Sequence, residues 1–169
     1  MSRSDKEWAA DNSVLSRFAR SGRWEFLERL LPSVWTTGFI IAEVEEGLKN
    51  PKYAGLKVVL EAVRKGWLKV IENEDLTEEE RATMAKVPMS LGDADASLIA
   101  VCVHRGMGLL TVDERLSEEA KQRRIEVKGI WELLSDAIVQ GLLTPQEADE
   151  ILDDMESRAS YRLLRRFAR

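Results

Sequence analysis

The sequence predicts an α/β domain built around a parallel sheet of about five strands. Short apolar runs alternate with segments of helical periodicity, which is typical of strands joined by helical crossovers. The chain has 169 residues, of which 44% are hydrophobic and 33% charged, enough for one domain with a sizeable core. The apolar runs are shorter than the roughly 18 residues that a membrane span needs, so we expect no membrane partner.

The cysteine, histidine and charge content argues against several classes of site. Cys102 is the only cysteine, so no internal disulfide can form, and the first residues lack the apolar stretch of a signal peptide. We therefore expect a cytoplasmic protein. His104 is the only histidine, which argues against a metal site built from several histidine or cysteine ligands. The net charge of -5 gives no bulk attraction to nucleic acid, so binding would need a local basic patch.

In the first half of the chain, each predicted strand is short and a helix follows it. The first helix ends before Pro32, and the Ser-Gly-Arg sequence at 21–23 can interrupt it. Gly47 and Gly66 mark the ends of the next two helices. The expected elements are a strand over 7–10, a helix over 13–31, a strand over 33–37, helices over 38–48 and 54–66, and a strand over 67–72.

In the second half, helix signals are stronger. Thr77 and Glu80 have the spacing of a capping box, and Gly106 stops the apolar helix that follows. Thr144 is a favourable N-cap with Pro145 at the first helical position. The expected elements are helices over 77–87 and 95–106, a strand over 107–113, a helix over 114–124, a strand over 125–129, and helices over 130–141 and 144–158.

Acidic residues occupy similar positions in several segments. Asp11 and Asp113 come just past the carboxyl ends of predicted strands, where sites form in open α/β sheets. Glu43 lies in the first turns of the helix after the second strand, and Asp93 and Asp95 lie at the start of the helix before the fourth. Carboxylates at one edge would suit Mg²⁺, which prefers oxygen ligands and can activate water near a phosphodiester. Capping and the helix dipole also favour acids at helix starts, so a structural role is the alternative for each.

Three blocks of sequence resemble the motifs of the PIN domain family. "DNSVLSRFARSGRWEFLERL" resembles the first motif, "TTGFIIAEVEEGL" the second, and "DADASLIAVCVHRGMGLLTVDERL" the third and fourth together. The resemblance covers about 8–128 and implies a three-layer α/β/α fold. We expect a PIN-like domain over 1–130, with residues 131–169 forming a C-terminal helical extension that packs on the same domain and ends in a basic tail.

The resemblance assigns roles to several residues. By motif, Asp11 matches the family's first acid, Glu43 the second and Asp113 the fourth. Thr111 matches a Ser/Thr of the fourth motif, and its hydroxyl can hold a carboxylate or a water. Asn12 could orient Asp11 or contact a phosphate.

The third acid is either Asp95 or Asp93. Asp95 has the family's spacing to Gly106, whereas Asp93 follows a glycine, as in some variants of the motif. Helical residues two apart point about 200° apart, so both can reach one metal only if Asp93 lies in the cap. We favour Asp95 as the ligand, with Asp93 as a cap or outer ligand.

Other polar residues near these motifs have weaker assignments. Ser13 is the more favourable cap of the first helix, with Asn12 beside it. For the last residues of the chain, we favour the alternative of a solvated or disordered terminus. The basic residues that could contact an RNA backbone are Arg17, Arg20, Arg165 and Arg166.

The resemblance implies a metal-dependent endoribonuclease that hydrolyses RNA phosphodiester bonds. Mg²⁺ or Mn²⁺ would be held by the acids at 11, 95 and 113, with Glu43 as a ligand or as the residue that orients water. Many PIN proteins are toxins of toxin–antitoxin pairs, which implies an antitoxin partner, and homodimers are common in the family. One alternative is a non-catalytic module of the same fold that binds nucleic acid or protein. Another is an α/β signalling receiver, which also has acids at strand ends.

Overall fold

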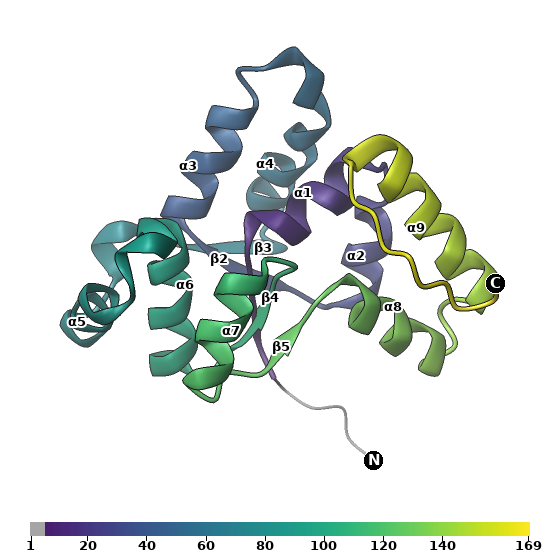
Figure 1. Cartoon of the computed structure of the whole chain (residues 1–169). Helices are drawn as coiled ribbons and strands as arrows, with labels where there is room; N and C mark the ends of the chain where they lie inside the picture. The colour runs from purple at the N-terminus through teal and green to yellow at the C-terminus, as the bar shows by residue number, and fades with distance from the viewer. Residues whose placement is uncertain (1–5) are drawn as a thin grey trace.

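A parallel sheet of five strands forms the centre of the computed structural model, which describes residues 6–169 (Figure 1). The strand order is β3-β2-β1-β4-β5, and every neighbouring pair is parallel. The predicted fold class is therefore confirmed. The strands are β1 (Trp8–Ala10), β2 (Val34–Thr37), β3 (Leu68–Ile71), β4 (Gly108–Leu110) and β5 (Val127–Lys128).

Helices cover both faces of this sheet. The connections from β1 to β3 and those from β3 to β5 move across the sheet in opposite directions, so right-handed crossovers place their helices on opposite faces. Accordingly α1 packs against α4, and α6 against α7 (Figure 1). The helices are α1 (Asn12–Arg20), α2 (Trp24–Leu30), α3 (Gly38–Gly47), α4 (Lys57–Arg64), α5 (Glu78–Lys86), α6 (Gly92–Arg105), α7 (Glu114–Gln122), α8 (Ile130–Val139) and α9 (Pro145–Ala159), with single turns η1 (Pro51–Leu56), η2 (Asn73–Asp75) and η3 (Met89–Leu91).

The element boundaries follow the sequence signals closely. The region predicted as one helix over 13–31 is interrupted at Gly22, whose positive φ of 76° ends α1. The predicted capping box of Thr77 and Glu80 is present, and Thr144 caps α9 with Pro145 at its first position. The largest shifts are of three residues: α4 begins at Lys57 and not at 54, α6 begins at Gly92 and not at 95, and β4 ends at Leu110 and not at 113.

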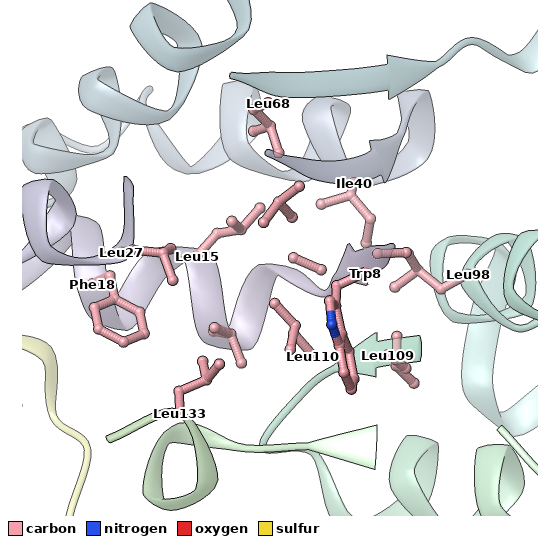
Figure 2. Close-up of a cluster of buried hydrophobic side chains, with 14 of the residues drawn as sticks. Trp8, Leu15, Phe18, Leu27, Ile40, Leu68, Leu98, Leu109, Leu110 and Leu133 are labelled. Atoms are coloured by element: carbon pink, nitrogen blue, oxygen red, sulfur yellow. The ribbon is translucent and has the colours of Figure 1, made fainter. Parts of the chain in front are cut away.

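The core lies on both faces of β1 and β4 (Figure 2). Leu15 and Phe18 of α1 and Leu98 of α6 are fully buried in this core. Burying each such side chain contributes about 1.5–3 kcal/mol. Gly108 pairs with Trp8, and a Cβ at position 108 would lie 2.4 Å from the Trp8 ring, so glycine is required there.

The C-terminal part of the chain packs on the first helix of the domain. Among the helices, α9 contacts mainly α1 and α8. The predicted boundary at 130–131 falls at the start of α8, and the division of the chain there stays a prediction. Within residues 6–169, the helices are all too short or too polar to cross a bilayer.

Candidate active site

The strand order places the candidate site at a switch point of the sheet. From β1 the chain proceeds to β2 and β3 on one side, whereas β4 and β5 lie on the other side of β1. In open α/β sheets a crevice forms at this point, outside the carboxyl ends of the strands. Asp11 directly follows β1, and Asp113 follows β4 three residues after its end. These two acids therefore lie at the edge where such sites form.

Four carboxylates from four separate segments interact at this edge. The pKa of Asp95, in the first turn of α6, is raised to about 7, first by burial and then by the negative charges of Asp11, Asp113 and Glu43. The pKa of Glu43 is raised first by burial of its carboxyl and then by the charge of Asp11, although the residue as a whole is exposed. The acids predicted at 11, 43, 95 and 113 are thus brought together.

Asp11 is the buried member of this group and is held by two hydroxyls. Ser13 Oγ and Thr111 Oγ1 both donate to its Oδ2, at 2.7 and 2.9 Å. Burial raises the pKa of Asp11, and the charge of Asp113 adds to this, while the two hydroxyls and the backbone N–H of Asn12 lower it. The carboxyl group is therefore both desolvated and fixed in orientation.

The same two hydroxyls join the ends of β1 and β4. Thr111 Oγ1 accepts the backbone N–H of Asp113 at 3.0 Å, and Ser13 Oγ accepts that of Val112 at 3.1 Å. Each hydroxyl carries one proton and donates it to Asp11. The hydroxyl oxygens of Ser13 and Thr111, which lie 3.2 Å apart, therefore have no proton left for a hydrogen bond to each other. The prediction that the Thr111 hydroxyl holds a carboxylate is confirmed.

Ser13 does not cap α1, so the expected capping role is wrong. The N-cap of α1 is Asp11, not Ser13, and the Ser13 hydroxyl belongs to the network around the Asp11 carboxylate instead. A Ser or Thr two residues after an Asp can form such a local side-chain pair, which is the signal in the sequence for this role. Asn12 contributes its backbone N–H, and its side-chain Oδ1 is buried without a hydrogen-bond partner in the described structure.

Asp113 combines two roles at the start of α7. Its Oδ1 accepts the backbone N–H of Leu116 at 2.9 Å and so caps the helix, while the side chain stays exposed at the crevice. Glu43, by contrast, makes no such local bond within residues 6–169. The neighbouring Glu46 is paired with Lys49 at 2.8 Å, whereas Glu43 forms no ion pair among the described residues.

Asp93 does not cap α6, so the expected capping role is wrong, and its role as an outer ligand stays a prediction. The helix begins at Gly92 with Leu91 at the N-cap, which places Asp93 inside the first turn, exposed, about 200° around the axis from Asp95. Because a shared metal required Asp93 in the cap, the geometry favours Asp95 as the third acid. A buried bond of 2.8 Å between the hydroxyls of Thr37 and Ser97 ties this helix to the end of β2, a link that the sequence did not reveal.

The four arginines predicted to contact RNA differ in whether they already form ion pairs within the protein. Arg166 is engaged: it forms ion pairs with Asp153 and Glu156 at 3.1 and 3.3 Å. Arg20 lies 4.5 Å from the centre of the Tyr53 ring. Among the residues that the structure describes, Arg17, Arg20 and Arg165 form no ion pair, so the predicted contact of Arg166 with RNA is the one that the structure does not favour.

The donor set suits a hard divalent cation. All candidate ligands are carboxylate oxygens. Charge repulsion adds to the effect of burial in raising the pKa of Asp11, Glu43 and Asp95, and a bound cation would relieve that repulsion. The hydrogen bonds from the Ser13 and Thr111 hydroxyls to one oxygen of Asp11 would orient this carboxylate as a metal ligand. Within residues 6–169, no three acidic, histidine or cysteine side chains already form a closed ligand set, so the carboxylates would have to turn toward the ion.

Comparison with known families gives one match. A family model described as a PIN domain matches residues 7–168, nearly the whole chain. A search of curated proteins finds none that matches. PIN domains are generally nucleases, which are hydrolases, and usually use divalent metals. The extent of the match, together with the parallel sheet and the acids at its switch point, shows that this chain belongs to the PIN domain family.

Proposed function

We propose that this protein is a metal-dependent endoribonuclease that hydrolyses phosphodiester bonds of RNA. The observation that carries the proposal is the mutual interaction of Asp11, Glu43, Asp95 and Asp113 at the switch point of the sheet. Perturbed carboxylates gathered in a crevice are a common feature of active sites. Family membership supports nuclease chemistry, and the all-oxygen donor set supports a divalent metal.

Each residue of the site has a distinct task in this proposal. Asp11, Asp95 and Asp113 would hold Mg²⁺ or Mn²⁺, and Glu43 would be a further ligand or orient a water. When bound, such an ion activates water and stabilises the leaving oxygen of a phosphodiester. Ser13 and Thr111 keep the Asp11 carboxylate oriented.

The other nucleophile and base candidates lie away from the site. Cys102 is buried, and burial raises the pKa of its thiol to about 12, so it is not a thiolate at neutral pH. His104 is near the far end of α6 from Asp95, where its Nε2 contacts the Thr83 hydroxyl at 2.7 Å. These placements favour activated water over a side chain as the nucleophile.

Membership of the family also supports a toxin-like role, and we propose a protein antitoxin as the partner and a homodimer as the assembly. Growth arrest on expression of the chain, relieved by the product of a neighbouring gene, would test the toxin role. Growth that is unaffected by an RNA-cleaving form of the chain would reject that role and leave the nuclease proposal standing.

Cleavage of labelled single-stranded RNA by the purified chain tests the nuclease proposal. We expect cleavage with Mn²⁺ or Mg²⁺ and none with EDTA. Asp113→Asn should abolish it while α7 stays folded, because asparagine caps a helix about as well as aspartate. Asp136→Asn is the matched control, since Asp136 pairs with Lys128 away from the acids. Undiminished cleavage by the Asp113→Asn variant would reject the proposal.

A further inference from the structure

The last ten residues of the chain, 160–169, form a fixed strap. Ser160 adopts a left-handed conformation with φ of 54°, and the chain then turns back along α9 (Figure 1). Asp149 is 1% exposed, and its two carboxylate oxygens accept the backbone N–H groups of Phe167 and Ala168 at 2.6 and 2.9 Å. The Phe167 ring stacks on Trp131 with centroids 3.8 Å apart. The alternative of a free, solvated terminus is therefore wrong, and we call this segment the C-terminal strap.

A groove connects the strap with the acidic site. It has a volume of about 720 Å³ and lies between α7, the start of α8 and the strap. Thr111 and Asp113 line it at the acidic site, and Tyr161 and Arg165 line it on the strap. Its volume is in the range of about 300–1,000 Å³ that is usual for ligand sites.

Arg17 is a partly desolvated cation without a bonded anion beside this groove. Its guanidinium lies 5.8 Å from the centre of the Tyr161 ring, and its Nε is buried without a partner in the described structure. Within the described residues, its side chain makes one hydrogen bond, a long one of 3.4 Å to the hydroxyl of Ser16. Burial lowers the pKa of Arg17, and the charge of Asp11 opposes this, but an arginine stays protonated. Phosphate oxygens are acceptors that would satisfy such a group.

Arg165 is the second cation without an ion pair on this side of the groove. It lies over the Trp131 ring at 4.2 Å from the centroid, whereas the neighbouring Arg166 and Arg169 both pair with Asp153. The wall on α7 includes the acids Glu114 and Glu118 and one cation, Lys121, and Glu132 of α8 also lines the groove. Because the acids outnumber Lys121 there, a nucleic-acid backbone would follow the strap, and the α7 wall offers no net positive track for a second strand.

We propose that the C-terminal strap is part of the substrate-binding surface, where Arg17 and Arg165 bind phosphates of a single-stranded RNA that leads from the acidic site into the groove. Tyr161 is a positioning residue, because its ring holds the guanidinium of Arg17 beside the groove. This inference rests on the proposed nuclease function and adds to it the path of the substrate.

The salt dependence of RNA binding tests the two arginines. Binding of a fluorescent single-stranded RNA is measured by anisotropy in EDTA, so that no cleavage occurs. Arg17→Gln and Arg165→Gln should each weaken binding and make the slope of log Kobs against log salt shallower by about 0.7. Arg64→Gln is the control, since Arg64 ends α4 before β3, at the opposite edge of the sheet, and should change neither quantity.

Variants of Tyr161 test the positioning role. Tyr161→Leu should weaken RNA binding and raise KM for cleavage, whereas Tyr161→Phe keeps the ring and should restore both. Mn²⁺ affinity should be unchanged in both Tyr161 variants. If the wild-type chain cleaves RNA but both arginine variants keep its affinity and salt slope, the inference is overturned and the nuclease proposal stands. If the wild-type chain neither binds nor cleaves RNA, both are rejected.

Discussion

Asp95→Asn should stabilise the metal-free protein at pH 8. The folded protein raises the pKa of Asp95 from 3.8 to about 7, because the carboxyl is partly buried among three other acids. Between these two values the folded state binds more protons than the unfolded state, so the free energy of unfolding falls as the pH rises from 4 to 7. Below the lower value both states are protonated and the penalty vanishes. Above about pH 7 it is fully present.

The size of this penalty follows from the pKa shift. A shift of about three units at 1.36 kcal/mol per unit gives an upper limit of roughly 4 kcal/mol. The carboxyl keeps contact with solvent, which screens these charges and reduces the penalty, so we expect about 1–3 kcal/mol. The carboxylate of Asp95 has no hydrogen-bond partner within residues 6–169, so its replacement by the asparagine amide breaks no hydrogen bond.

Chemical denaturation in EDTA at pH 4 and pH 8 measures the effect. Asp93→Asn is the matched control, because Asp93 occupies the same helical turn and loses the same interaction with the helix dipole, but is exposed. We expect Asp95→Asn to stabilise at pH 8 and to have little effect at pH 4. Mn²⁺ should stabilise the wild type more than Asp95→Asn. Equal effects of both substitutions at pH 8 would refute the reasoning, since the acids would then not meet.

Three further substitutions test the supports of the site and the fold. Thr111→Val should lower the free energy of unfolding by about 1–3 kcal/mol, because it leaves Asp11 short of a donor, and Thr111→Ser should restore it in the same denaturation assay. Gly108→Ala should cost about 1–3 kcal/mol in thermal unfolding by forcing a methyl group into the Trp8 ring, and no loss there would contradict the close packing. Asp149→Asn should free the strap and speed proteolysis after Arg165, and an unchanged cleavage pattern would show that other contacts suffice.

Much of the fold could be predicted because local signals agreed with it. The strand-end position of Asp11, the Gly106 stop and the capping boxes fix their elements from a few neighbouring residues. The start of α6 was misplaced because Gly92 and Asp93 are poor helix-interior residues, yet the chain continues the helix through them. Tertiary packing of the buried helix behind them decides that boundary.

The candidate site was predictable only in part for a similar reason. Each acid stands at a helix start or a strand end, where capping alone would explain it, so convergence could not be read from any one segment. The strand order brings the ends of β1 and β4 together, and this order is a property of the whole chain. The bond that joins Ser13 to Val112 and the contact of Tyr161 with Arg17 depend on partners 99 and 144 positions away, beyond any local pattern.

The nature of the groups around Asp11 bears on what the site can bind. Two neutral hydroxyls hold the buried carboxylate, and the nearby cation, Arg17, interacts with it without forming an ion pair. An arginine bonded to Asp11 would have lowered its pKa and stabilised the fold, but it would also have cancelled the charge that attracts a cation. Hydroxyls orient the carboxylate and leave that charge in place. The cost is the repulsion felt at Asp95, so the metal-free protein should be less stable than its packing allows, and a divalent cation should recover that stability.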